Sequence, residues 1–172
     1  MTAALWLLAL QGTLGAFDTL YFHEWRARLP ARGPTTHPEL RLHAARDFVY
    51  AVLFATLPWL AWKGAWATVL VVLLLMEIGI TLADFVIEDR VRASLGGVYP
   101  GERVTHAVMG IVYGAFLAGL GRALAGWWAE PTALALAPPP APLALRAVLG
   151  AMAAGVFLSG VRDLAAARGG TR

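Results

Sequence analysis

Five long apolar stretches separate the charged segments of this 172-residue chain. A helix needs roughly 20 apolar residues to cross a bilayer core of about 30 Å, and each stretch is close to that length. The expected spans are Ala3–Phe22, Phe48–Trp66, Ala67–Ile87, Val104–Trp128 and Leu143–Leu164. Only 15% of the residues are charged, against about a quarter in soluble domains. The sequence therefore predicts an all-α integral membrane bundle, with residues 1–172 forming a single domain.

The basic residues predict how this bundle is oriented. Arginine and lysine favour the cytoplasmic side of a membrane protein. Eleven of them follow the first or third expected span or lie at the C-terminal end, whereas Lys63 and Arg146 lie on the opposite side and Arg122 lies inside the fourth span. We expect the N-terminus outside and the C-terminus in the cytoplasm, in a bacterial inner membrane. Because the net charge of +3 arises from these loops, we expect no nucleic-acid partner.

Several kinds of chemistry are excluded by composition and motif. The chain has no cysteine, which removes disulfide frameworks, thiolate metal sites and thiol nucleophiles. It also lacks a glycine-rich phosphate loop, a serine-centred elbow and the helix signature of zinc proteases. Any chemistry must therefore come from carboxylates, imidazoles, hydroxyls and arginines.

The acidic residues and histidines gather at the expected cytoplasmic ends of the first four spans. His43 with Asp47, and Glu102 with His106, are spaced four residues apart, which places each pair on one helix face. Carboxylate and imidazole suit iron, zinc or manganese, and helical bundles hold such metals between facing helices. The predicted metal ligands are His43, Asp47, Asp84, Glu88, Glu102 and His106, with Asp18 flanking them.

A structural interpretation of these charges stays open beside the metal site. Acids and arginines at a membrane boundary often form simple ion pairs, and we expect this of Glu24, Asp89, Arg90 and Arg92. For Glu102 and His106 the two interpretations are evenly matched. Three histidine or acid pairs on three helices nevertheless favour a shared site.

Glu77 is the most unusual residue of the predicted spans. It lies about 16 Å deeper than Glu88 along the third expected helix, and nothing near it in sequence neutralises it. An unpaired buried carboxylate is unfavourable, so it must be protonated or find a partner. We expect Glu77 and Asp84 to be the catalytic residues, with Glu77 acting as a ligand or proton carrier. A hydrogen bond to Gln11 is the alternative for Glu77.

The leading functional interpretation is a metal-dependent membrane enzyme that acts on a lipid-like or amphipathic substrate. Iron would support oxidation or desaturation, whereas zinc or magnesium would support hydrolysis or group transfer. The competing interpretations are a proton- or ion-coupled carrier that uses Glu77 and Asp84, and a non-catalytic assembly subunit. Small residues spaced by four on the fourth and fifth spans, such as Gly110 with Gly114, predict close helix packing within the monomer or in a homo-oligomer.

Overall fold

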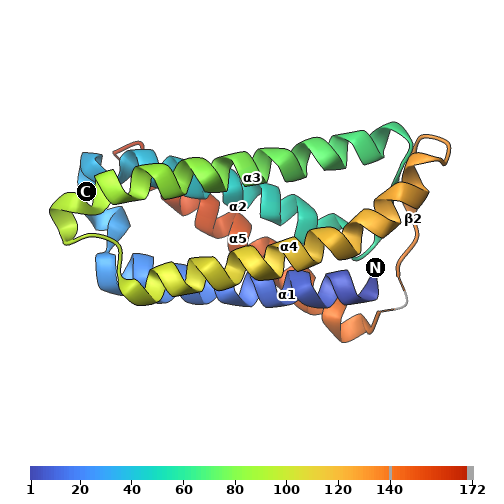
Figure 1. Cartoon of the computed structure of the whole chain (residues 1–172), viewed down its shortest axis with the longest axis horizontal. Coiled ribbons are helices and arrows are strands. Elements are labelled where there is room, and N and C mark those ends of the chain that lie inside the picture. The colour runs from blue at the N-terminus through green and yellow to red at the C-terminus, as the bar shows by residue number, and fades with distance from the viewer. Residues whose placement is uncertain (140, 170–172) are drawn as a thin grey trace.

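The structure, a computed structural model, describes residues 1–139 and 141–169. Within them the chain forms five α-helices that run along one long axis (Figure 1). Their bounds are α1 Thr2–Phe17, α2 His37–Thr56, α3 Ala65–Arg92, α4 Pro100–Trp128 and α5 Leu143–Ala166. The predicted all-α bundle is confirmed.

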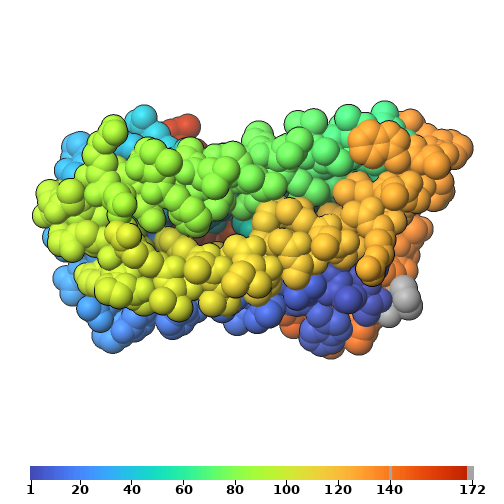
Figure 2. Space-filling view, in the orientation of Figure 1, coloured from blue at the N-terminus to red at the C-terminus, as the bar shows by residue number. Residues whose placement is uncertain are grey.

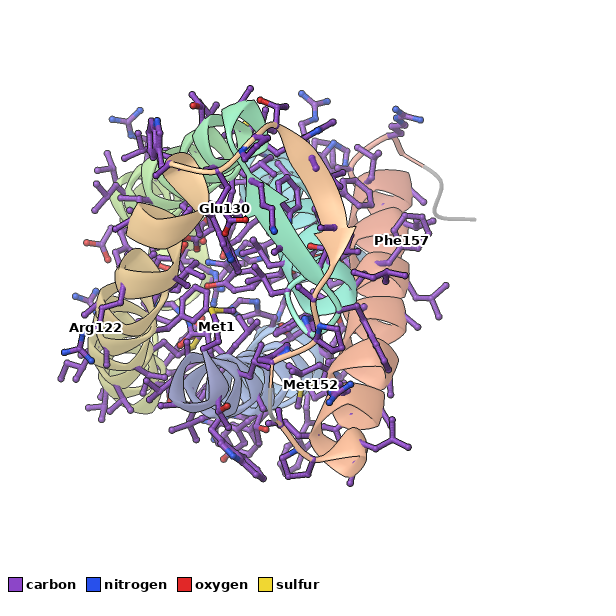
Figure 3. The ribbon with its side chains drawn as sticks, turned by 90° about the vertical axis from the view of Figure 1, so that its right-hand side faces the viewer. Met1, Arg122, Glu130, Met152 and Phe157 are labelled. Carbon is purple, nitrogen blue, oxygen red and sulfur yellow. The ribbon has the colours of Figure 1, made fainter. Side chains whose placement is uncertain are left out.

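One short two-stranded sheet is added to this bundle at the end where the N-terminus lies, which we call the sheet end (Figure 1). β1 Leu60–Lys63 pairs antiparallel with β2 Ala133–Leu136. Figure 3 views the molecule from this sheet end and shows both strands crossing the helix ends, with Arg122 pointing away from the bundle. Because Arg122 is exposed near the end of α4, its long side chain can reach the membrane surface from there.

Four of the helical segments are long and apolar enough to cross a membrane, which indicates membrane integration. They are Thr2–Ala31, Ala65–Leu95, Pro100–Trp128 and Leu143–Ala166. α2 is not among them, because it carries the charged residues Glu39, Arg41, Arg46 and Asp47. It packs against both α3 and α5, and nine of its 20 residues are buried. α2 is therefore the helix that the others enclose.

The limits of α2 differ from the expected span Phe48–Trp66. The helix begins eleven residues earlier, at His37, with Pro38 in its first turn, where the missing proline N–H leaves no intrahelical hydrogen bond unmade. It ends at Thr56, two residues before Pro58, which has no N–H with which to continue the helical hydrogen bonds. The segment that follows becomes β1.

The apolar core fills the middle of the bundle and its sheet end. Leu8, Leu53, Leu70 and Phe116 come from four helices, and each is completely buried. The predicted small-residue faces behave differently, because a Cβ added at Gly110, like one added at Gly114 or Gly150, meets nothing within 4 Å. The homo-oligomer predicted from those faces stays a prediction.

Candidate metal centre

Buried charged and histidine side chains gather at one end of the bundle, opposite the sheet end. We call this end the polar end. Each of these residues is 8% exposed or less. The set consists of Asp18, His23, Glu39, His43, Asp84, Glu88, Arg92, Glu102, His106 and Asp163. They are contributed by α2, α3, α4, α5 and the helical segment that follows α1, so the polar end is formed only when the bundle assembles.

A widened helix turn positions the first two of these residues. α1 continues directly into η1 Asp18–Ala27, which is a π-helix. In an α-helix, residues five apart point about 140° away from each other. A π-helix has i→i+5 hydrogen bonds, so Asp18 and His23 lie side by side, with Asp18 Oδ2 3.3 Å from His23 Nε2. Such π-helical turns are frequent at functional sites.

Asp18 and His23 form a candidate metal group with His106 of α4. One ligand atom from each of the three residues lies within 4.8 Å of the other two. His106 Nε2 is 3.1 Å from the same Asp18 Oδ2 that His23 approaches. Two imidazoles and one carboxylate are a donor set suited to iron, and they also suit zinc or manganese. This group could hold a metal ion.

The hydrogen bonding of the group agrees with that assignment. Among the described residues, Asp18 Oδ1 and His23 Nε2 are buried without a hydrogen-bond partner. His23 Nε2 does lie 3.1 Å from Glu102 Oε1, but this contact lacks hydrogen-bond geometry. Buried polar atoms are rarely left unsatisfied, so ligand atoms that converge in this way suit a bound cation.

The charge balance of the polar end also favours a cation. Five buried carboxylates surround the three histidines: Asp18, Glu39, Asp84, Glu88 and Glu102. The guanidinium groups of Arg46 and Arg92 pair with members of this set. Burial lowers the pKa of His43, but Asp84 outweighs this effect and raises that pKa to about 9, so His43 carries a positive charge. The carboxylates then outnumber the cationic side chains by two. Buried charges need compensation, and a divalent cation removes this excess.

Arg92 forms ion pairs between helices at the polar end and is not an exposed interfacial charge. It is 1% exposed, and its Nη2 lies 2.6 Å from Glu39 Oε1 and 2.9 Å from Glu102 Oε1. A guanidinium has a planar fork that suits two carboxylates. Arg92 of α3 thereby joins the first turns of α2 and α4. By contrast, Asp89 pairs with Arg103 on the exposed surface, as expected for an interfacial charge.

His43 and Asp47 are predicted to act as a pair, but in the structure they contact different partners. His43 Nε2 lies 3.2 Å from Asp84 Oδ2 on the next helix, and its ring stacks on that of His23 with 4.6 Å between centroids. Asp47 instead faces α5, close to Gly160. His43 and Asp84 therefore lie beside the candidate metal group, whereas Asp47 lines a neighbouring cavity.

Glu102 and His106 both reach the group but contact different partners. Glu102 is held by Arg92 and lies next to His23. His106 contacts Asp18, and its Nδ1 is 3.8 Å from Glu88 Oε2. The metal-ligand roles predicted for His43, Asp47, Asp84, Glu88 and Glu102 stay predictions.

Sequence reasoning missed His23 as a ligand candidate and gave Asp18 only a flanking place. Both follow from reading the first span with α-helical spacing, which places the two residues on different faces. Glu39 was missed because α2 was expected to begin at Phe48. The clearest sequence signal for His23 was its place among aromatic residues at the end of the first apolar run, in "LYFHEW".

Two cavities border the candidate metal group. The larger, of about 460 Å³, lies between α1, α2 and α5 and is lined by Asp18 at its polar side. The smaller, of about 180 Å³, lies between α3 and α4 and is lined by His106. Figure 2 shows a hollow between these two helices near the middle of the molecule. Arg46 lines both cavities.

Glu77 lies at the deep side of the smaller cavity. It is 3% exposed, and Thr81 Oγ1 donates a 2.9 Å hydrogen bond to its Oε1. Within the described residues its Oε2 has no hydrogen-bond partner, and neither does the buried hydroxyl of Tyr113 in the same cavity. The alternative hydrogen bond from Gln11 goes to the Tyr50 hydroxyl instead, at 3.3 Å.

Comparisons of the chain with models of protein families, with curated proteins and with solved structures find no match.

Proposed function

We propose that this chain is an integral membrane enzyme that holds one divalent metal at Asp18, His23 and His106 and acts on a lipid-like substrate. The observation that carries the proposal is the convergence of these three buried side chains between two cavities. A metal with three protein ligands keeps coordination positions for substrate or water. The larger cavity would bring a substrate from the membrane to that position.

The chemistry depends on which metal is bound. Zinc would supply an activated water for hydrolysis or group transfer, and iron or manganese would support oxidation. The protein's own residues orient the ligands. Glu88 faces Nδ1 of His106, the arrangement in which a carboxylate fixes the ring of a metal-bound histidine. Arg92 holds Glu102 beside His23.

A second candidate function is a proton- or ion-coupled carrier, and Glu77 favours it. Ionisable residues inside a membrane often mark proton relays. Glu77 faces a cavity with room for several waters at roughly 10–15 Å³ each, and this cavity reaches His106. The non-catalytic assembly subunit is the third interpretation, and it requires neither a metal nor a proton path.

Elemental analysis of the purified, full-length protein tests the proposal. We expect near-stoichiometric iron, zinc or manganese in the wild type, and loss of most of it in His23→Ala and in His106→Ala. Arg103→Gln is the matched control, because it removes an exposed ion pair at the same end of the bundle.

Three results would count against the enzyme. A metal-free wild type with Glu77-dependent proton flux into vesicles would favour the carrier, and one without such flux would favour the assembly subunit. Equal metal loss in Arg103→Gln and His106→Ala would remove the assignment of the ligands, because it would reflect general misfolding.

A further inference from the structure

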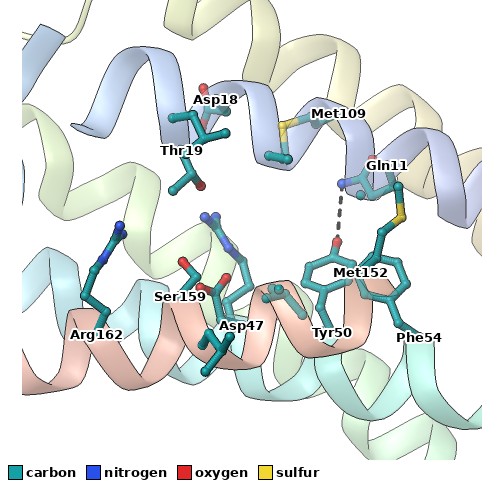
Figure 4. A pocket seen from close by; sticks show the side chains of 18 residues that line it. Gln11, Asp18, Thr19, Asp47, Tyr50, Phe54, Met109, Met152, Ser159 and Arg162 are labelled. Atoms are coloured by element: carbon teal, nitrogen blue, oxygen red, sulfur yellow. Dashed lines mark hydrogen bonds between the residues drawn. The ribbon is translucent and has the colours of Figure 1, made fainter. Parts of the chain in front are cut away.

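The larger cavity has a polar half and an apolar half. Figure 4 shows Asp18, Thr19, Ser159, Asp47 and Arg162 around one half, and Tyr50, Phe54, Met109 and Met152 around the other. Its volume of about 460 Å³ falls within the roughly 300–1,000 Å³ of small-molecule sites. The residues between Met152 and Arg162 of α5 follow it over about 15 Å. A narrow amphiphile has this length and this distribution of polarity.

The rim of the cavity lies on the exposed face of the bundle. Leu20 and Leu158 line the cavity, yet they are 64% and 65% exposed. In a membrane protein, apolar residues exposed on the outer face of the helices contact lipid. An amphiphile in the bilayer can therefore reach the cavity sideways, between α1 and α5, without passing through water.

We infer that this cavity binds a single-chain amphiphile with an anionic head group. The end of the chain lies against Phe54 and Met152, and the head group lies near Arg46, Ser159 and Arg162. In this position the head group is next to Asp18, so the inference rests on the proposed function where it makes this amphiphile the substrate. Binding itself requires no metal.

Hydrogen-bond donors at the polar half select the chemistry of the head group. Arg46 and Arg162 bring two guanidinium groups to it, and Asp47 and Asp18 bring two carboxylates. Arg46 also pairs with Asp84, and Arg162 pairs with Glu24 and Asp163. A guanidinium has five N–H donors, so each of these groups keeps donors for a carboxylate or phosphate oxygen, whereas a trimethylammonium head group offers them no acceptor.

Two glycines define the apolar half and provide a matched test. A Cβ at Gly12 would lie 2.8 Å from Phe54 Cζ and 2.9 Å from Met152 Sδ, so this glycine lets both side chains close the deep end against α1. A Cβ at Gly155, which lines the cavity, meets nothing within 4 Å. Gly155→Phe should therefore fill the cavity without a backbone clash. Gly150→Phe is its control, because Gly150 is equally open on the same helix but does not line the cavity.

Photochemical cross-linking tests the inference. The full-length protein, in phosphatidylcholine vesicles, is illuminated with dodecanoic acid that carries a diazirine beside its methyl end, and mass spectrometry locates the cross-links. We expect them at Phe54 and Met152. Gly155→Phe should reduce them about tenfold, as overpacking of a filled site does, while Gly150→Phe leaves them unchanged. Gly155→Leu gives a smaller reduction if the larger substitution fails to fold.

Competition and metal content decide the remaining parts. Dodecyl phosphate should displace the probe and dodecyltrimethylammonium should not; equal displacement by both would overturn the anionic head group. Cross-links spread over the lipid-facing helices, or unaffected by the Gly155 substitutions, would overturn the site. His106→Ala lies outside this cavity and should lose metal but keep the cross-links. A metal-free wild type that still cross-links at Phe54 would refute the proposed function while the binding site stands.

Discussion

The polar end and the surroundings of Glu77 bury carboxylates in opposite ways. At the polar end, Glu39 and Glu102 share the guanidinium of Arg92, which comes from a third helix. Glu77 is buried to a similar degree, but among the described residues it forms no ion pair. Thr81 donates a hydrogen bond to it, and the hydroxyls of Tyr50 and Tyr113 lie beside it. The charges of Glu39 and Glu102 are compensated by Arg92 and so hold the helices together. Among the described residues no cationic side chain pairs with Glu77, so a charge on Glu77 would not be compensated by an ion pair.

Replacing Arg92 should have the largest effect on this comparison. Arg92→Leu leaves Glu39 and Glu102 buried without their common partner, and breaking a buried ion pair by removing one side costs about 3–5 kcal/mol. We expect a loss of this size in the free energy of unfolding, measured by thermal or denaturant unfolding in detergent.

The control for Arg92 is the exposed pair of Arg103 and Asp89. Their side chains are 58% and 62% exposed, and pairs of this kind contribute about 0–1 kcal/mol. Arg103→Gln should therefore unfold almost like the wild type. If Arg92→Leu were equally mild, the polar end would not depend on compensated charge and the comparison would fail.

Removing the metal should have the next largest effect. A ligand that binds only the folded state stabilises it by about 3 kcal/mol at a hundredfold excess over its Kd. A chelator should therefore lower the Tm of the wild type and leave that of His106→Ala unchanged. A chelator that lowers both Tm values equally would place the metal elsewhere in the chain.

The membrane bundle could be predicted from sequence because it depends on the length of apolar runs. α3, α4 and α5 begin and end within a few residues of the expected limits. The limits of α2 could not be predicted in this way, since it carries charges that only an enclosing set of helices can satisfy. Its start lies outside the apolar run, at His37 and Pro38.

The candidate site was harder to predict because its contacts run between helices. Spacing along one helix indicated that His43, Glu102 and His106 were important, but it paired them with neighbours on their own helices. In the structure their partners come from other helices, as with His43 and Asp84. The pairing of Asp18 with His23 requires a π-helical turn, and no sequence rule for helix faces includes one.

Glu77 should respond to substitution more weakly than Arg92, and in a way that depends on the substitute. Glu77→Gln keeps the shape and can still accept from Thr81, so the free energy of unfolding should change by less than about 1 kcal/mol. Glu77→Leu removes that acceptor and leaves polar atoms of the cavity unpaired, at about 1–3 kcal/mol. Unfolding in detergent measures both.

Activity or proton flux separates the two roles of Glu77. If it carries protons, Glu77→Gln loses this function at nearly unchanged stability. If Glu77→Gln is silent while Glu77→Leu is destabilised, Glu77 is a structural hydrogen-bonding group and the carrier interpretation fails.

The smallest effect on stability is expected from cysteine labelling, which tests the orientation of the two ends. The native chain has no cysteine, so Glu130→Cys at the sheet end and Arg90→Cys at the polar end each give one reactive site. Both positions are exposed. Gly64, also at the sheet end, is unsuitable for this substitution, because its φ is +56° and a Cβ there would lie 2.5 Å from the Thr132 hydroxyl.

We expect an impermeant maleimide to label Glu130→Cys in intact cells and Arg90→Cys only after the membrane is opened. This result would place the candidate metal group on the cytoplasmic side, where the arginines gather. The reverse pattern would keep the bundle but turn the polar end outward, so its metal would have to come from outside the cell. Labelling of both positions in intact cells would mean that α3 does not cross the membrane. Glu77 would then have access to water, and the contrast between its uncompensated charge and the paired charges of the polar end would lose its physical basis.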